Sequence, residues 1–233
     1  MTAKLPHWIE ASGFGLAAVA GAVNAIGVLS LQQQPVSHVT GTTTALSLSL
    51  VHQNSSLLTH SLMVLLAFTL GAIVSGAIIE NAVLKLGRRY SMAFLLESAL
   101  LATAMLLLGQ SSVTGHYFAA AACGLQNGMV STYSGAIVRT THMTGLFTDL
   151  GTMLGLRLRG HAIDIRRAQI YLLLISGFLV GGIIGGAGFE RWNHLALLIP
   201  IVVTALLGLW CWFHRRNGKE PSPVDGAPTG AAM

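Results

Sequence analysis

The sequence predicts an all-α polytopic membrane protein, with six transmembrane helices and two re-entrant half-helices in a 3+3 inverted repeat. Three observations predict this fold class. The 233 residues are 53% hydrophobic and only 9% charged, with a mean hydropathy of +0.67, whereas about a quarter of a soluble domain is charged. Long apolar stretches alternate with short polar loops, and one polar phrase, His-x-Thr-Gly, occurs twice.

Six apolar stretches are long enough to cross a bilayer core of about 30 Å as helices. The region that follows them is rich in Pro, Gly and Ala, a composition typical of disordered segments. We therefore expect a single transmembrane domain over residues 1–214 and a disordered cytoplasmic tail over 215–233. The six expected spans are 10–33, 57–80, 91–109, 115–138, 168–188 and 195–214.

Two weaker apolar segments, 35–51 and 139–156, each carry one His-x-Thr-Gly phrase. They are short for a crossing, because about 16 helical residues cover only about 24 Å. In lipid, irregular backbone is tolerated only where protein or a water-filled cavity covers it. These segments are therefore expected to enter the membrane and return to the same side.

Each weak segment is expected to enter as an extended chain, over 35–41 and 139–145, and to return as a half-helix. Thr40 and Thr144 are expected to cap the two half-helices, since Thr is a common N-cap residue. The two half-helices would then point their N-termini at each other in the middle of the membrane. Each N-terminus would offer unpaired N–H groups and a partial positive charge.

The distribution of Lys and Arg predicts the orientation. With the N-terminus in the cytoplasm and six crossings, only Arg191 of the 13 Lys and Arg residues lies outside. This arrangement fits the positive-inside rule and places both termini in the cytoplasm. It also accounts for the net charge of +5 without nucleic acid, because the basic residues lie in short loops between spans.

The chain contains an internal repeat, with copies over 10–109 and 115–214. Chance matches are expected among Gly, Ala and Leu, but the matched His, Thr and Asn residues are rarer and occur in the same order. Each copy holds three crossings, an odd number, so the copies must have opposite orientations, as in many transporters. The matched pairs include Gly21 and Gly124, Asn24 and Asn127, His38 and His142, Thr40 and Thr144, and Gly41 and Gly145.

A solute site is expected near the midplane, where the two copies meet. For the Thr and Gly residues, close helix packing is an equally good interpretation, and for the His and Asn residues a structural hydrogen bond is the alternative. The candidate solute-binding residues are Asn24, His38, Thr40, Gly41, Asn127, His142, Thr144 and Gly145.

Two acids are candidates for proton coupling. Asp149 lies in the first turn of the expected second half-helix, where an acid also suits the helix dipole. Glu97 lies within a span, where an ionisable residue is a candidate functional residue. The alternative for Glu97 is a protonated side chain with one hydrogen bond to a neighbouring helix.

These features favour a transporter or channel for a small polar or anionic solute. A membrane-embedded enzyme that uses His38, His142 and Asp149 is a weaker alternative, because no known hydrolase, zinc-protease or nucleotide-binding motif is present. A non-catalytic partner subunit is a third. No cofactor, metal site or catalytic residue is predicted; the expected partners are the bilayer, the solute and a second copy in a homo-oligomer.

Asn24 in a Gly/Ala-rich first span, the two phrases HVTG and HMTG, and GLQN over 124–127 together resemble the YoaK-like family of bacterial inner-membrane proteins. The resemblance covers most of residues 12–214. It implies six spans and a multi-pass protein of the bacterial inner membrane, and it supplies neither a substrate nor catalytic residues. Members of that family often carry Asp where this chain has Asn24, which weakens a proton-coupling role at this position.

Overall fold

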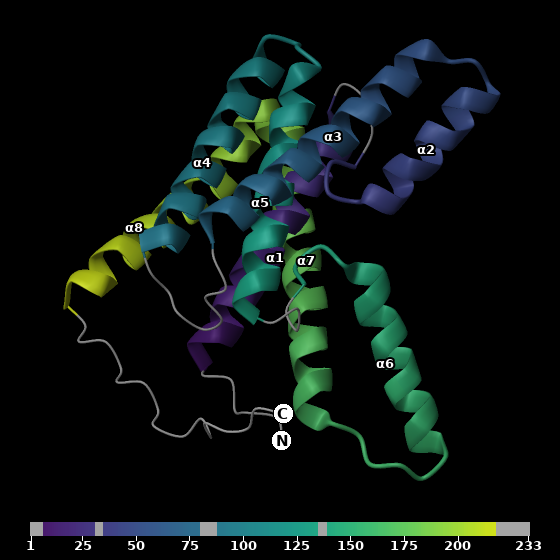
Figure 1. The fold of residues 1–233 in the computed structure, drawn as a ribbon, viewed down its shortest axis with the longest axis vertical. Helices are drawn as coiled ribbons and strands as arrows, with labels where there is room; N and C mark the ends of the chain where they lie inside the picture. The colour runs from purple at the N-terminus through teal and green to yellow at the C-terminus, as the bar shows by residue number, and fades with distance from the viewer. Residues whose placement is uncertain (1–6, 31–34, 80–87, 135–138, 218–233) are drawn as a thin grey trace, which may run out of the picture.

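The computed structural model describes residues 7–30, 35–79, 88–134 and 139–217, and all regular secondary structure in these ranges is helical (Figure 1). The predicted all-α class is therefore confirmed. The elements are α1 (His7–Leu29), α2 (Val39–Val51), α3 (Ser55–Ile78), α4 (Arg88–Gly109), α5 (Thr114–Ser134), α6 (Met143–Leu158), α7 (Ile165–Trp192), the 3₁₀ helix η1 (Asn193–Leu197) and α8 (Leu198–Asn217).

Four stretches of the described chain are long and apolar enough to cross a membrane. They are Ala11–Leu29, Ser55–Ile78, Arg88–Gly109 and Ile165–Phe213, of which the last has 49 residues and contains both α7 and most of α8. The chain is therefore a multi-pass membrane protein whose apolar helices contact the lipid bilayer.

The expected span over 115–138 forms α5, but this helix is not among the four apolar stretches. Its sequence includes the polar residues His116, Gln126 and Asn127. Since α5 packs against both α3 and α4, His116 and Gln126 are buried against protein, and a helix in such a position tolerates polar groups that lipid would not. A total of six crossings stays a prediction.

The two half-helices begin earlier than the sequence predicts. Their N-caps are His38 and His142, so Thr40 and Thr144 lie inside the first turn and the prediction that they cap the helices is wrong. Thr hydroxyls can be satisfied within a helix by the carbonyl four residues back, and Thr44 Oγ1 donates in this way to the carbonyl of Thr40 over 3.1 Å. The Thr-rich phrase therefore starts the helix directly after the histidine.

Helix α1 packs against α7, and α3 packs against α5, as backbone-to-backbone contacts (Figure 1). A Cβ added to Gly21 of α1 would lie 2.1 Å from the Phe178 carbonyl oxygen of α7. A Cβ added to Gly124 of α5 would lie 1.9 Å from the Phe68 carbonyl oxygen of α3. Small residues allow this close approach of membrane helices, and only glycine fits at these two positions.

The two helix pairs are related by the matches in the sequence. Gly21 matches Gly124, and Phe68 matches Phe178 in the alignment of the third helix of each half. The same alignment relates the N-caps of α3 and α7, because the Asn54 side chain accepts from the Leu57 amide and the Asp164 side chain accepts from the Arg167 amide. Equivalent residues thus make equivalent contacts in the two halves.

Helix α4 packs against α5 and α8 and completes the bundle. Ser91 and Ser98 of α4 donate to the carbonyls of Gly208 and Ile201 of α8. Helix α8 continues to Asn217, three residues into the expected tail over 215–233; the rest of that tail lies outside the described residues. Glu80, an end of an expected span, also lies outside them.

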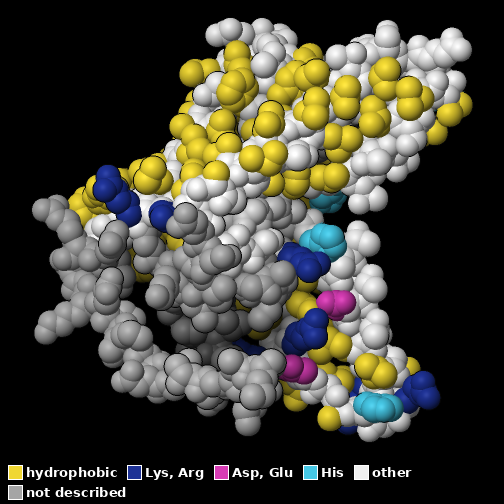
Figure 2. All heavy atoms as spheres, in the orientation of Figure 1, with side chains coloured by type: hydrophobic (Ala, Val, Ile, Leu, Met, Phe, Trp, Pro, Cys, Tyr) yellow, Lys and Arg dark blue, Asp and Glu magenta, His cyan; other side chains and the backbone are white. Residues whose placement is uncertain are grey.

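Figure 2 shows apolar side chains across the upper part of one face, over α3 and α4. On the same face the charged side chains of the described residues lie outside this apolar area, most of them around α6 and α7 and some at the left beside α4 and α8. This separation of an apolar zone from a charged zone is typical of a protein that sits in a bilayer.

Candidate functional site

The chain that leads into α2 is tied to the middle of α1 by Asn24. The Ser37 hydroxyl donates to Asn24 Oδ1 over 2.8 Å, and the Ser37 amide donates to the same oxygen over 3.3 Å. Asn24 and Ser37 are both buried. A buried amide that accepts two hydrogen bonds holds this stretch of backbone in place.

Asn127 holds the second half-helix in a similar way. The Thr141 hydroxyl donates to Asn127 Oδ1 over 2.7 Å, and the Asn127 side-chain amide donates to the carbonyl of Cys123 over 2.9 Å. Asn24 and Asn127 are therefore anchors for the two half-helices. Their predicted contact with a solute stays a prediction.

These anchors show how far each segment returns into the bundle. Asn24 lies five residues before the end of α1 at Leu29, and Asn127 lies seven residues before the end of α5 at Ser134. At 1.5 Å per residue these positions are about 8 Å and about 10 Å from the helix ends. Ser37 and Thr141 therefore lie alongside the long helices, short of their ends, directly before the short helices begin.

His38, the N-cap of α2, reaches the middle of α7. Its ring stacks on Phe178, with ring centroids 5.7 Å apart and an interplanar angle of 17°. Phe178 is the fourteenth of the 28 residues of α7. The Nε2 atom of His38 is buried and has no hydrogen-bond partner among the described residues. The N-cap of α2 therefore lies beside the centre of α7 and carries an unsatisfied imidazole nitrogen.

His142, the N-cap of α6, is exposed and lies over its own first turn. A Cβ added to Gly145 would lie 2.4 Å from His142 Cδ2, so glycine makes room for this ring. Gly41 is less constrained, because the nearest atom to an added Cβ is Pro35 Cγ at 3.9 Å. The glycines of the two phrases therefore have different local roles.

The first turn of each half-helix has N–H groups that no side chain caps. The first helical hydrogen bonds run from Thr42 to His38 and from Leu146 to His142, each over 3.2 Å. Neither histidine makes a side-chain capping bond. The amides that precede these bonds are the donors that a helix N-terminus offers to an anion.

Hydroxyl groups line the exposed part of both half-helices. Thr40 and Thr144 are exposed near their starts. The Thr43 and Thr148 hydroxyls donate to the carbonyls four residues back, over 2.8 Å in both cases. The protons of these two hydroxyls are therefore used within their own helices. The donors that remain at this site are the backbone amides and the imidazoles.

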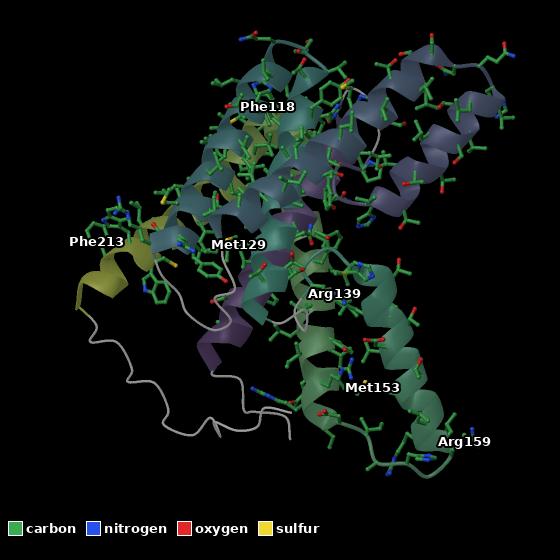
Figure 3. All side chains as sticks on the ribbon, in the orientation of Figure 1. Phe118, Met129, Arg139, Met153, Arg159 and Phe213 are labelled. Carbon is green, nitrogen blue, oxygen red and sulfur yellow. The ribbon has the colours of Figure 1, made fainter. Side chains whose placement is uncertain are left out.

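Asp149, a candidate for proton coupling, has two partners on α7. The Tyr171 hydroxyl donates to Asp149 Oδ2 over 2.8 Å, and Arg167 Nη2 lies 3.5 Å from the same oxygen. The Asp149 carboxylate therefore links α6 to α7. Figure 3 shows α6 beside α7, with Arg139 before α6, Met153 within it and Arg159 after its end. Coupling of this residue to proton movement stays a prediction.

Glu97, the other candidate, lies in α4 with 1% of its surface exposed. Its Oε2 atom has no hydrogen-bond partner among the described residues. A lone buried carboxylate is costly in an apolar interior, so the protonated form is favoured there. Proton coupling through Glu97 stays a prediction.

His38, His142 and Asp149 do not combine into a metal site. No group of three or more His, Cys, Asp or Glu side chains within the described ranges could hold a metal ion.

Several polar residues that are buried in the bundle were not among the site residues predicted from the sequence. Gln126 donates to the carbonyl of Leu16 over 2.7 Å and to Thr140 Oγ1 over 3.3 Å, which ties α5 to α1 and to the segment before α6. His60 and His116 form a second buried group with Ser30. A signal for them existed, because His and Gln within apolar helices are costly and need partners.

Comparison with known proteins places the chain in one family. The chain matches no curated protein and no solved structure. A family model described as a protein of unknown function, DUF1275, matches residues 12–210. This match spans most of the 233 residues, including both His-x-Thr-Gly phrases and every helix from α2 to α7. The protein therefore belongs to the DUF1275 family of membrane proteins.

Proposed function

We propose that this protein is a transporter or channel for a small polar or anionic solute, which passes between the starts of α2 and α6. One observation carries the proposal: each half of the chain contains a short helix whose histidine N-cap is preceded by a segment anchored to an asparagine within a longer helix. Two such helix starts offer amide donors at membrane depth. These donors would replace the water molecules that an anion gives up there.

We further propose six crossings in a 3+3 inverted repeat, with copies over 10–109 and 115–214 in a single transmembrane domain. The equivalent glycine contacts at Gly21 and Gly124 support this arrangement, as do the equivalent N-caps Asn54 and Asp164. In such folds, the solute site lies where the two halves meet. The narrower resemblance to YoaK-like proteins is consistent with this plan and stays a prediction.

We propose that the protein lies in a bacterial inner membrane with both termini in the cytoplasm. Arg157 and Arg159 at the end of α6, and Arg166 and Arg167 at the start of α7, would then face the cytoplasm. Arg191, near the other end of α7, would face outward. This distribution follows the positive-inside rule.

In this mechanism the backbone amides of the two first turns hold the solute, and His38 and His142 donate or accept hydrogen bonds at its two sides. Thr40, Gly41, Thr144 and Gly145 shape the entrances. Asn24 and Asn127 keep the helix starts in position through Ser37 and Thr141. Asp149 and Glu97 are the groups that would respond to a proton gradient.

Thiol accessibility tests the proposed path. His38→Cys and His142→Cys would be made separately in a Cys123→Ala, Cys211→Ala background and treated from each side with a small membrane-impermeant reagent. We expect position 38 to react from outside and position 142 from inside. If neither position reacts from either side, the two helix starts are sealed and the proposed path is wrong.

Solute flux in proteoliposomes tests the function itself. We expect saturable uptake of at least one small anion from a broad panel, reduced about tenfold or more in His38→Ala and in His142→Ala, a loss of about 1.4 kcal/mol in solute stabilisation. His161→Ala is the matched control, because His161 is exposed in the connection between α6 and α7. Absence of any saturable flux would remove the transport proposal.

A further inference from the structure

Two histidines and a serine form a buried cluster that the proposed transport path does not use. His60 of α3, His116 of α5 and Ser30, just after α1, are 3%, 1% and 8% exposed. His60 is the sixth residue of α3 and His116 the third of α5. The cluster therefore lies near the ends of three helices, whereas the anchors of α2 and α6 lie deeper in α1 and α5.

The hydrogen bonds of Ser30 determine which nitrogen of His116 carries the proton. The Ser30 hydroxyl donates to the carbonyl of Gly27 over 2.8 Å. Its single proton is then used, so in its contact with His116 Nε2 the hydroxyl oxygen accepts from an Nε2–H group. In neutral His116 the other nitrogen, Nδ1, therefore carries a free lone pair.

That lone pair is buried and unsatisfied. His116 Nδ1 has no hydrogen-bond partner among the described residues, and neither do Nδ1 and Nε2 of His60. The two imidazole rings meet edge to face, with centroids 5.5 Å apart and an interplanar angle of 75°. A buried polar group without a partner costs about 1–3 kcal/mol, so three such atoms on two neighbouring rings point to a bound species.

We propose that His60 and His116 bind one Cu(I) ion. Imidazole nitrogen is a good ligand for copper. Ser30 supplies the outer hydrogen bond that a metal-binding histidine commonly makes through its other N–H group, which fixes the tautomer and the orientation of the ring. Copper in the monovalent state accepts two nitrogen ligands in a near-linear arrangement, which is the number that this cluster offers.

The composition of the cluster argues against a divalent ion. Structural zinc sites use four protein ligands, and no third His, Cys, Asp or Glu joins these histidines in a metal-binding group within the described ranges. A divalent ion would also keep its full charge in a poorly solvated site, and that cost rises steeply with charge. A monovalent ion between two neutral imidazoles has the smaller cost.

The spacing of the rings suits two ligands. Metal–nitrogen bonds of about 2 Å on opposite sides of an ion require nitrogen atoms about 4 Å apart. In the structure the rings meet edge to face with centroids 5.5 Å apart, so binding requires both side chains to rotate until one nitrogen lone pair of each ring faces the ion. The ring of Tyr117 lies next to that of His60, with centroids 5.5 Å apart and an interplanar angle of 38°.

The test is Cu(I) binding to the purified full-length protein in detergent, measured by competition with a chromophoric Cu(I) chelator under reducing, anaerobic conditions. A Cys123→Ala, Cys211→Ala background removes thiolate ligands. We expect one equivalent of bound Cu(I) in this background, lost in His60→Gln and in His116→Gln. His161→Ala, at an exposed histidine, is expected to keep the full equivalent.

Two further readouts separate a metal site from a structural effect. Ser30→Ala is expected to keep the stoichiometry and to lower the affinity by about tenfold, because the outer hydrogen bond contributes on that scale. X-ray absorption of the Cu(I) form is expected to show two nitrogen neighbours and no sulfur. Absence of bound Cu(I) in the Cys-free protein, retention of the ion in both His variants, or a coordination number of four would each overturn the proposal. None of these results depends on whether the protein transports a solute.

Discussion

At the scale of single residues, the two asparagines make similar hydrogen bonds in the two matched stretches of chain. Asn24 accepts a hydrogen bond from the Ser37 hydroxyl, and Asn127 accepts one from the Thr141 hydroxyl. Each bond fixes the residue directly before a histidine N-cap, so it also fixes the direction of the first helical turn. Loss of one anchor should therefore disturb one half-helix and leave the other intact.

Asn24→Ala and Asn127→Ala test this independence. We expect Asn24→Ala to raise amide hydrogen exchange over 36–38 by roughly 3- to 20-fold, because hydrogen bonds between membrane helices contribute about 0.6–1.7 kcal/mol. Asn127→Ala should have the same effect over 139–142. Exchange measured by mass spectrometry in both variants is the check. If either substitution loosens both segments equally, the anchors do not act separately.

The His-x-Thr-Gly phrase located the start of each half-helix only to within a few residues, because Thr40 and Thr144 were expected as the caps and the N-caps are His38 and His142. The Thr-Gly phrase favoured an extended entry because both residue types weaken helices. In the structure the Thr hydroxyls bond to carbonyls one turn back, as Thr43 does to Val39, and this local satisfaction lets the helix start at once. The buried pair His60 and His116 was missed because its members are 56 positions apart in the sequence, and only the pairing of α3 with α5 brings them together.

At the scale of helices, the fold depends on contacts that leave no room for a side chain. Gly21 and Gly181 join α1 to α7, and Gly71 and Gly124 join α3 to α5, each within 2.1 Å between an added Cβ and a facing carbonyl oxygen. Backbone cannot withdraw as the end of a flexible side chain can. These glycines therefore set the distance between the helices of each pair.

Gly21→Ala is expected to destabilise the protein by about 3 kcal/mol, because an overpacked contact forces backbone to shift. Gly15→Ala in the same helix should be nearly neutral, since an added Cβ there meets nothing within 4 Å. Thermal unfolding of the two variants in detergent is the measurement. Equal melting temperatures for Gly21→Ala and Gly15→Ala would show that α1 and α7 are not in contact at Gly21.

The fastening of α6 to α7 predicts a local effect. Tyr171→Phe removes the hydroxyl that donates a hydrogen bond to Asp149 and accepts one from Arg167 Nε. The side chains of Asp149 and Arg167 are 46% and 55% exposed, so the loss of stability should stay below about 1 kcal/mol. Hydrogen exchange should nevertheless rise in α6 and stay unchanged in α2, where Ala45 occupies the position of Asp149. A rise in both helices would contradict a local fastening.

At the scale of the whole molecule, composition together with the long apolar stretches predicted the all-helical membrane class, and four of these stretches are helices in the structure. The helix α5 shows the limit of that approach. It is polar at Gln126 and Asn127, and hydropathy does not reveal that Gln126 bonds to α1 and that both side chains bond to the segment before α6. The number of membrane crossings therefore cannot be counted from hydropathy without knowing which helices are covered by other helices.

The proposed topology predicts opposite sides for two exposed histidines in short connections. His52 follows α2, and His161 follows α6. In the Cys-free background, His52→Cys should react with an impermeant thiol reagent only from outside, and His161→Cys only from inside. Labelling of intact and permeabilised cells is the measurement. Labelling of both positions from one side would rule out opposite orientations of the two halves.

The pairing of the helices also has a consequence for how the protein is made. Helix α1 finds its main partner in α7, and α3 finds its main partner in α5, so the first half of the chain leaves the ribosome before the surfaces that it packs against exist. The first half should therefore wait in the membrane as loosely associated helices, exposed to quality-control proteases, until α5 and α7 have been inserted. Two separately expressed halves, divided between α4 and α5, should each be short-lived alone and should protect each other when made together.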